Sequence, residues 1–347
     1  MTWRLISVVV TAIVAAPAAA GPVTPLFAAG DPIRLEIRGP ISAIVDGPRE
    51  KVTPRPSELS LFGSGERHPI ALTPRGITRL RRETCRFPPL RIEFVTPPAV
   101  TSLFAGQRRL KLVTHCRQAE HFQQYVLLEY AAYRLYNLLT PASFRVRLAT
   151  LDYINGNGRP YVSRVGFLIE DKDDLGRRIG QRPAAVGDSV GLFRLEPRAA
   201  ARSALFQYMI GNLDWSMKAG PAGEGCCHNS RLFALPSARS GAADLLTVPY
   251  DFDFSGLVNA PYAVPPDGSD VSVRRRVYKG YCHHNRAALL AAVEFRSLRP
   301  ALLAEFAAIP QLDVRTRRKA VDYLEEFFAE IASDERMATK LLAGCLK

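Results

Sequence analysis

The spacing of apolar residues changes along the chain, and this change limits the folds that it can adopt. Residues 21–100 contain short runs in which apolar and polar residues alternate, as in β-strands. Apolar residues then recur at helical spacing over 118–139, and from 285 onward the pattern is almost wholly helical. We therefore expect an α+β protein. Strands are predicted at 33–37, 68–72, 90–94, 109–114, 145–154, 161–169, 232–235 and 245–250, and helices at 118–139, 197–211, 285–296, 299–308, 314–332 and 334–345.

The helix predicted at 118–139 is apolar or aromatic on most of its circumference, which indicates that it is buried on most sides. Glu129 falls within its aromatic stripe. A buried carboxylate needs a cationic or hydrogen-bonding partner, because removing it from water alone costs several kcal/mol. We therefore expect a specific partner for Glu129.

Two turn signals suggest how the chain is divided. Asn-Gly-Asn-Gly at 155–158 predicts a tight hairpin between the strands on either side. Residues 170–190 are polar and contain glycine, which is typical of a connecting segment. We place a boundary there, between a β-rich N-terminal lobe with one buried helix (21–170) and a mainly helical C-terminal lobe (171–347).

The first 20 residues have the pattern of a secretory signal peptide. Arg4 precedes the apolar run 5–15, and small residues lead to Gly21. We expect cleavage after Ala20 and export to a periplasm or to the outside of the cell. The apolar run is shorter than the ~20 residues of a spanning helix, and charges interrupt every later candidate, so no membrane span is expected.

Six cysteines follow this segment, and an even number in an oxidising compartment favours disulfides. The adjacent Cys226 and Cys227 are expected to have different partners, one of them Cys282. An alternative is a zinc site formed by Cys226-Cys227-His228 and Cys282-His283-His284, although Cys-x-x-Cys spacing is absent.

The formal net charge is +13, and the positive residues are spread along the chain rather than gathered in one block. This distribution favours an anionic partner. Zinc-finger spacing, basic heptads and aromatic RNA-binding signatures are all absent from the sequence, so nucleic acid is not expected.

Three polar residues are predicted at the ends of secondary-structure elements, where they can converge on one site. Asp214 follows a helix, Asn229 precedes a strand and Asp251 ends another strand. Phosphoryl transfer uses such a set: one carboxylate orients or deprotonates the attacking hydroxyl, while an amide oxygen and a second carboxylate hold Mg²⁺. Asp253 is the rival metal ligand. Taken singly, each of these residues is also compatible with capping or turn formation.

Lys111 and Glu129 have the placement of the lysine–glutamate pair of kinases, with the lysine on the last strand before the helix that carries the glutamate. Arg91, on a neighbouring strand, is the alternative to Lys111. Gly63-Ser64-Gly65 and Arg75-Gly76 are the candidates for a phosphate-binding loop, and neither is a full glycine-rich motif.

Several of these motifs resemble the spore coat protein H (CotH) kinase-like family over about residues 75–260. The resemblance implies a two-lobed atypical protein-kinase-like fold, ATP with Mg²⁺ or Mn²⁺, and phosphorylation of protein hydroxyls. It also implies that Asp214 is the catalytic base, that Asn229 and Asp251 are metal ligands, and that Glu170 lies near the adenine-side hinge. The motifs are Gly211-Asn212-Leu213-Asp214, His228-Asn229, Tyr250-Asp251-Phe252-Asp253 and Gly166-Phe167-Leu168-Ile169-Glu170.

The sequence thus predicts an exported kinase-like enzyme that binds a nucleotide and transfers its phosphoryl group to a hydroxyl of a protein. The alternative is a non-catalytic, pseudokinase-type module that binds an anionic partner. The absence of a full glycine-rich phosphate loop from the sequence favours this alternative.

Overall fold

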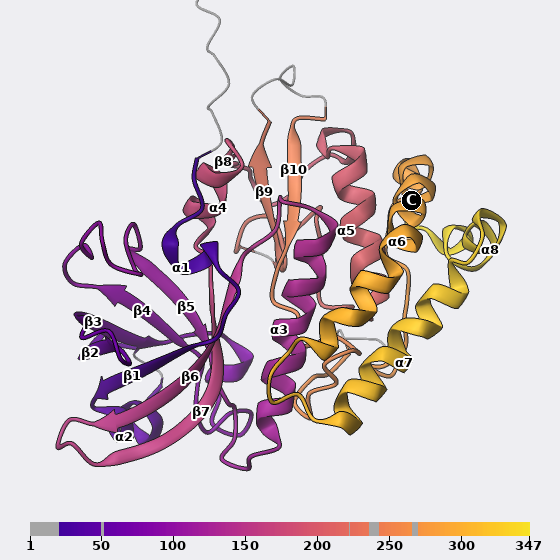
Figure 1. Ribbon diagram of the computed structural model, residues 1–347. Helices are drawn as coiled ribbons and strands as arrows, with labels where there is room; N and C mark the ends of the chain where they lie inside the picture. The colour runs from indigo at the N-terminus through magenta and orange to yellow at the C-terminus, as the bar shows by residue number, and fades with distance from the viewer. Residues whose placement is uncertain (1–20, 50–51, 222, 236–242, 266–269) are drawn as a thin grey trace, which may run out of the picture.

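The computed structural model describes residues 21–49, 52–221, 223–235, 243–265 and 270–347. The predicted signal peptide lies outside the described residues. Figure 1 shows strands β1–β7 on the left, helices α6–α8 on the right, and α3 between the two groups. Two short helices, α1 (Pro25–Ala28) and α2 (Ile41–Asp46), flank the first strand.

The first seven strands form a closed barrel in the order β1-β2-β3-β4-β5-β7-β6. Neighbouring strands are antiparallel except for β1 and β6, whose parallel pairing from Ile33↔Ala149 to Gly39↔Asn155 closes the barrel. Because β1 and β6 pair with each other, neither strand has a free edge with unpaired backbone groups along this contact. The strands are β1 (Ile33–Gly39), β2 (Arg55–Leu61), β3 (Arg67–Pro74), β4 (Leu90–Phe94), β5 (Arg109–Val113), β6 (Val146–Asn155) and β7 (Pro160–Ile169).

Alternating apolar residues fill the inside of the barrel. Side chains at every second position point to the same face of a strand, so each strand contributes a short apolar row to the interior. This packing forms one of the hydrophobic clusters of the protein. The rows include Leu35 and Ile37, Ile70 and Leu72, Leu90 and Ile92, and Leu110 and Leu112, all buried.

The closed barrel overturns the expected two-lobed atypical kinase-like fold. Periodicity located most of these strands, but β2 was missed, and the pairing of β1 with β6 joins segments that are far apart in the sequence. Spacing of apolar residues specifies which face of a strand is buried, whereas it carries no information about which strand lies beside it. The expectation of a kinase-like fold was therefore wrong.

The remaining elements surround a second, larger hydrophobic cluster. Helix α3 (Phe122–Leu139) belongs to this cluster together with α5 (Pro197–Met209), α6 (Asn285–Ala304) and α7 (Val314–Glu330). A small sheet of β8 (Arg182–Pro183), β9 (Ser230–Ala234) and β10 (Leu245–Pro249) lies beside them. Helix α4 (Lys172–Arg178) lies next to β8, whereas α8 (Asp334–Lys340) packs against α6 and α7.

Several sequence predictions are confirmed by these elements. The hairpin around 155–158 forms between β6 and β7, and the helices predicted at 118–139, 197–211 and 314–332 are present with shifted ends. One other prediction was wrong, because α6 continues through Pro300 instead of dividing near residue 297. The segment predicted as a connection contains the short helix α4.

All six cysteines form disulfides, as predicted, but both expectations about their pairing were wrong: Cys226 and Cys227 bond to each other, and neither bonds to Cys282. The bonds are Cys85–Cys116, Cys226–Cys227 and Cys282–Cys345. Cys282 does not reach the adjacent pair because the C-terminal segment folds back beside it: the backbone N–H of Cys282 donates to the carbonyl of Leu346 at 2.8 Å. Among the described helices, none is both long and apolar enough to cross a membrane.

Candidate functional site

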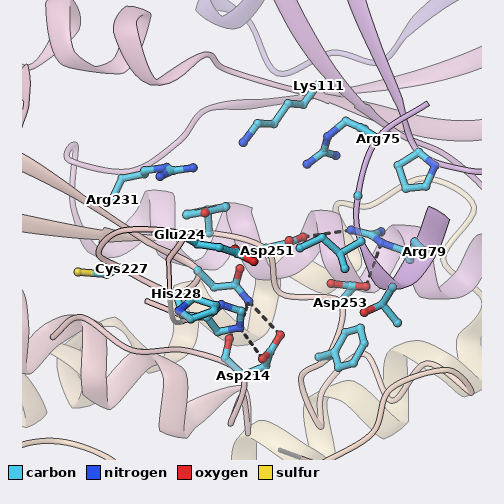
Figure 2. A pocket seen from close by; sticks show the side chains of 18 of the residues that line it. Arg75, Arg79, Lys111, Asp214, Glu224, Cys227, His228, Arg231, Asp251 and Asp253 are labelled. Carbon is cyan, nitrogen blue, oxygen red and sulfur yellow. Dashed lines mark hydrogen bonds and ion pairs between the residues drawn. The ribbon is translucent and has the colours of Figure 1, made fainter. Parts of the chain in front are cut away.

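A cavity of about 500 Å³ lies where one end of β4 and β5 meets the loops of the small sheet. Figure 2 shows the side chains that line it. The predicted site residues Lys111, Asp214, Asn229, Asp251 and Asp253 all line this cavity. Five predicted residues from four separate segments therefore converge, as expected for a shared site.

The pairing of β9 with β10 explains part of this convergence. These strands are antiparallel, with Ser230 opposite Pro249, so Asn229 just before β9 and Asp251 just after β10 lie at the same end of the sheet. The N–H of Tyr250 donates to the carbonyl of Asn229 at 3.1 Å, which fixes the two loops to one another. The sheet register thus places an amide and a carboxylate side by side.

Asn229 and Asp251 share an unusual backbone conformation. Their φ angles are 47° and 63°, in the left-handed region that few non-glycine residues occupy. Residues in this region cost about 1–3 kcal/mol each and often occur at functional sites, where surrounding contacts hold them. One such contact is visible here: the N–H of Asp251 donates to the Tyr133 hydroxyl of α3 at 2.9 Å.

Asp214 is positioned by the end of α5. Gly211, at φ 65°, stops this helix, as the sequence predicts, and the chain turns toward the cavity. The buried side chain of Asn212 then accepts a hydrogen bond from the N–H of Asp214 at 3.0 Å. Lys279 Nζ donates to the carbonyls of Leu213 and Trp215 on either side of it, at 2.7 and 2.9 Å. The backbone around Asp214 is therefore held from several directions.

The carboxylate of Asp214 has a partner for each oxygen. His228 Nε2 lies 2.6 Å from Oδ1, and Asn229 Nδ2 donates to Oδ2 at 3.0 Å and to the Asp214 carbonyl at 2.7 Å. The hydrogen bond with Asp214 raises the pKa of His228. Because the amide nitrogen of Asn229 is directed toward Asp214, its amide oxygen is the atom that remains for a cation.

Glu129, Asp251 and Asp253 form a carboxylate cluster on one side of the cavity. The Arg79 guanidinium lies among them, 3.2 Å from Glu129 Oε2, 3.0 Å from Asp251 Oδ1 and 3.1 Å from Asp253 Oδ2. The predicted pairing of Lys111 with Glu129 is therefore wrong, because Arg79 takes that place. Arg79 comes from the short helical turn Thr78–Leu80 that follows β3.

Burial dominates the electrostatics of this cluster. It raises the pKa of Glu129 to about 7 and, with the charges of Asp251 and Glu129, raises the pKa of Asp253 well above its usual range. Burial also acts to raise the pKa of Asp251, but the nearby charges of Arg79, Arg75 and Lys111 outweigh it and hold that pKa below its ordinary value. Asp251 is thus the member of the cluster best held as an anion.

The opposite side of the cavity carries Arg75, Lys111 and Arg231, which we call the cationic rim. Among the described residues, no ion pair involves any of these three side chains. Lys111 Nζ and the Arg231 guanidinium instead lie over the ring of Tyr250, at 4.9 and 5.0 Å from its centre. Burial and the neighbouring charge of Arg75 lower the pKa of Lys111 to about 8.

Of the two predicted phosphate-binding loops, only one lies at the cavity. Arg75 and Gly76 line the cavity, as does Arg91, the cross-strand neighbour of Lys111. Gly63 and Gly65 instead lie in the turn between β2 and β3, outside the cavity. The loop after β3 is therefore the one that faces the site.

Glu170 lies outside the cavity and is part of a buried ion pair. Arg178 donates to both of its oxygens at 2.9 Å, and the N–H of Arg145 donates to Oε2 at 3.0 Å. These contacts hold α4 against the ends of β6 and β7. The structure thus gives Glu170 a packing role away from the other site residues.

The zinc alternative loses its ligands because every cysteine is in a disulfide, which leaves no thiolate. Sequence reasoning missed Arg79, Arg231 and the contact of His228 with Asp214. Arg79 stands among several arginines of the segment 75–82, and nothing local distinguishes it from Arg81 or Arg82. His228 had a signal in the motif His228-Asn229, but the only role given to its side chain was that of a zinc ligand.

Comparison with known proteins identifies no relative: no model of a protein family matches the chain, and no curated protein matches it. The function has to be argued from the chemistry of the site itself.

Proposed function

We propose that this protein transfers the terminal phosphoryl group of ATP, bound with Mg²⁺ or Mn²⁺, to a hydroxyl group of a protein. One observation carries the proposal: Asp214 and Asp251 face the cationic rim across a single cavity, which Asn229 also lines. A volume of about 500 Å³ is within the range of small-molecule sites, about 300–1,000 Å³. The chemistry is the one implied by the resemblance to the CotH family, but it does not depend on a kinase-like fold.

The cationic rim suits a polyphosphate. Two guanidinium groups and one ammonium group converge there without carboxylate partners among the described residues, and such groups bind phosphate oxygens strongly. An unpaired cation that is partly buried is costly, so an anionic ligand would relieve the mutual repulsion of Arg75 and Lys111. The rim is therefore the proposed binding surface for the nucleotide phosphates.

The carboxylate side fits a divalent cation. Glu129 Oε1 is buried without a hydrogen-bond partner, and three carboxyl groups share one guanidinium, so their oxygen atoms outnumber the donors that face them. Asn229 and Asp251 are the proposed ligands, with Asp253 as the rival. When bound, such an ion neutralises charge on the phosphate oxygens during transfer.

Asp214 is the proposed base. Its side chain is 35% exposed at the cavity, so an acceptor hydroxyl can approach it. That hydroxyl oxygen attacks the γ-phosphorus while the bond from phosphorus to the bridging oxygen breaks. ADP leaves, and the hydroxyl proton passes to the Asp214 carboxylate. His228 and Asn229 orient this carboxylate through their hydrogen bonds.

Nucleotide binding tests the proposal directly. ATP with Mg²⁺ at one hundred times its dissociation constant should stabilise the wild-type protein by about 2.7 kcal/mol in thermal unfolding. Asp251→Ala should lose this stabilisation while it keeps a cooperative transition. The absence of any shift with nucleotides would contradict the proposal. Binding without release of ADP or labelling of protein hydroxyls would favour the pseudokinase-type module for anionic partners.

Export is the proposed setting of this activity. Pairing of all six cysteines is typical of proteins from oxidising compartments. A periplasm and the outside of the cell both meet this condition. Fractionation of cells that express the full chain, with detection of the protein cleaved after Ala20, tests it.

A further inference from the structure

We propose that the guanidinium of Arg79 occupies the place of a metal ion among Glu129, Asp251 and Asp253, and so prevents a metal ion from binding there. The site would then bind one divalent ion with its nucleotide rather than two. The number of ions per nucleotide rests on the proposed function. The closure of the cluster by Arg79 is independent of the proposed function, because it concerns only residues that are already in contact.

The cluster has the chemistry and the size of a site for a hard cation. One oxygen from each of Glu129, Asp251 and Asp253 lies within 4.8 Å of the other two. Three oxygens this close together can reach the metal–oxygen distances of about 2.3–2.6 Å that are typical of Ca²⁺ after a small inward movement, and a larger movement suits Mn²⁺ or Mg²⁺. Arg79 fills this space with a guanidinium.

The guanidinium satisfies the cluster only in part. Glu129 Oε1 and Asp253 Oδ2 are buried without a hydrogen bond, although Asp253 Oδ2 lies 3.1 Å from Arg79 Nε. The ion pair is close, but its N–H is not aligned with that oxygen. Glu129 and Asp253 are 2% and 4% exposed, so water cannot compensate for the missing bonds. These oxygens show that the guanidinium leaves part of the bonding capacity of the cluster unmet.

Arg79 also connects three parts of the protein. Its turn follows the loop of Arg75 and Gly76 at the end of β3, while its partners lie on α3 and in the loop after β10. A free metal ion could also neutralise the carboxylates, but it would not be attached to the turn after β3. The arginine therefore replaces an ion and holds the Arg75 side of the cationic rim above the cluster (Figure 2).

Asp251 lies between the cluster that Arg79 fills and the part of the cavity that Asn229 lines. Its Oδ1 accepts the hydrogen bond of Arg79, which leaves Oδ2 for an ion on the Asn229 side. Glu129 does not line the cavity, and Asp253 lines it with only 4% of its surface exposed. One divalent ion at Asn229 and Asp251, together with the fixed charge of Arg79, would supply most, though not all, of the positive charge that two divalent ions supply in other phosphoryl-transfer sites.

The test measures Mn²⁺ binding to the purified full chain without nucleotide, by electron paramagnetic resonance of free Mn²⁺. Arg79→Met should bind one Mn²⁺ at least about tenfold more tightly than the wild type, equivalent to about 1.4 kcal/mol. Adding Glu129→Gln to this variant should abolish the gain. Arg81→Met removes an arginine that is exposed on the same segment, and it should behave as the wild type.

A second titration includes a non-hydrolysable ATP analogue. The wild type should then bind one Mn²⁺ per chain, and Arg79→Met should bind two. The inference is overturned if folded Arg79→Met binds Mn²⁺ no better than the wild type, or if the wild type binds two ions with nucleotide. If circular dichroism shows that Arg79→Met is unfolded, the wild-type count with nucleotide decides: one ion supports the inference, and two overturn it.

Failure of the proposed function would look different. A wild type that binds no nucleotide contradicts phosphoryl transfer, yet the gain of Mn²⁺ affinity in Arg79→Met without nucleotide would still support the closure by Arg79. If Arg79→Met is also unfolded, Mn²⁺ binding to the wild type without nucleotide decides. Tight binding that Glu129→Gln abolishes would overturn the closure by Arg79. No such binding would support it.

Discussion

His228 Nε2 lies 2.6 Å from Asp214 Oδ1, so the proposed base is held by an imidazole that comes from a separate loop. Ser216 and His228 form an antiparallel bridge, in which the N–H of Ser216 donates to the carbonyl of His228 at 2.9 Å. The backbone bridge and the side-chain contact bring the loop after α5 and the loop before β9 together. This arrangement makes the two loops depend on one another.

Removing the proposed base should abolish transfer and preserve binding. Asp214→Asn keeps the shape of the side chain but cannot take a proton at the reacting hydroxyl. We expect kcat to fall by about 10²–10⁴-fold with little change in ATP affinity, measured by ADP release and by calorimetry. Glu58→Gln, on the surface of the barrel, is a matched control and should leave kcat unchanged. An active Asp214→Asn would exclude this residue as the base.

The contact between His228 and Asp214 predicts a pH dependence of stability. The hydrogen bond to Asp214 raises the pKa of His228 in the folded protein above the value of about 6.5 expected when unfolded. Its contribution is fully present below about pH 6.5 and is lost as pH rises through the folded pKa. Both side chains are about one-third exposed, so screening keeps the effect small. The Tm of the wild type should therefore fall more than that of His228→Gln as pH rises above about 6.5.

Lys111 predicts a pH dependence of nucleotide affinity. Burial lowers the pKa of its ammonium group to about 8, so above that pH the free protein loses one charge of the cationic rim. The Kd for ATP should increase as pH rises through about 8 in the wild type, whereas Lys111→Arg should keep its affinity there. Lys111→Met should bind weakly at every pH. Titrations between pH 7 and 9.5 are the measurement, and a wild-type Kd that is constant over this range would contradict the role given to Lys111.

Glu170 should affect stability and not the site. Arg178 is buried beside it, so Glu170→Gln leaves a cation without its full partner, at a cost on the order of 3 kcal/mol. Urea unfolding should show this loss, while the affinity for ATP stays that of the wild type at a temperature where both are folded. A loss of nucleotide affinity in Glu170→Gln without a loss of stability would show instead that Glu170 takes part in nucleotide binding.

The disulfide between Cys282 and Cys345 closes a loop of 63 residues around α6, α7 and α8. In the chain-entropy model, a loop of this length contributes about 4 kcal/mol to stability. Replacing both cysteines by serine should lower the free energy of unfolding by up to that amount and leave ATP affinity unchanged. Under reducing conditions the variant and the wild type should be equally stable, because the bond between Cys282 and Cys345 is then open in both.

The local structure of the chain was largely predictable, because it depends on residues that are close in sequence. The turn residues at 155–158 specify the β6–β7 hairpin, and Gly211 ends α5 because a residue without a Cβ tolerates its φ of 65°. Asp214, Asn229 and Asp251 stood at the ends of predicted elements, and the structure brings them to one cavity.

Long-range partners were decided only by the tertiary structure. Apolar periodicity does not reveal that β1 pairs with β6, which is why a closed barrel was not foreseen. Arg79 is indistinguishable from its neighbouring arginines until folding places it against Glu129, and Cys345 meets Cys282 only because the C-terminal segment returns. The sequence alone thus determined the elements and the chemical groups at their ends, since short-range backbone preferences suffice for these. Which groups meet depends on how the whole core packs, and only the tertiary structure contains that information.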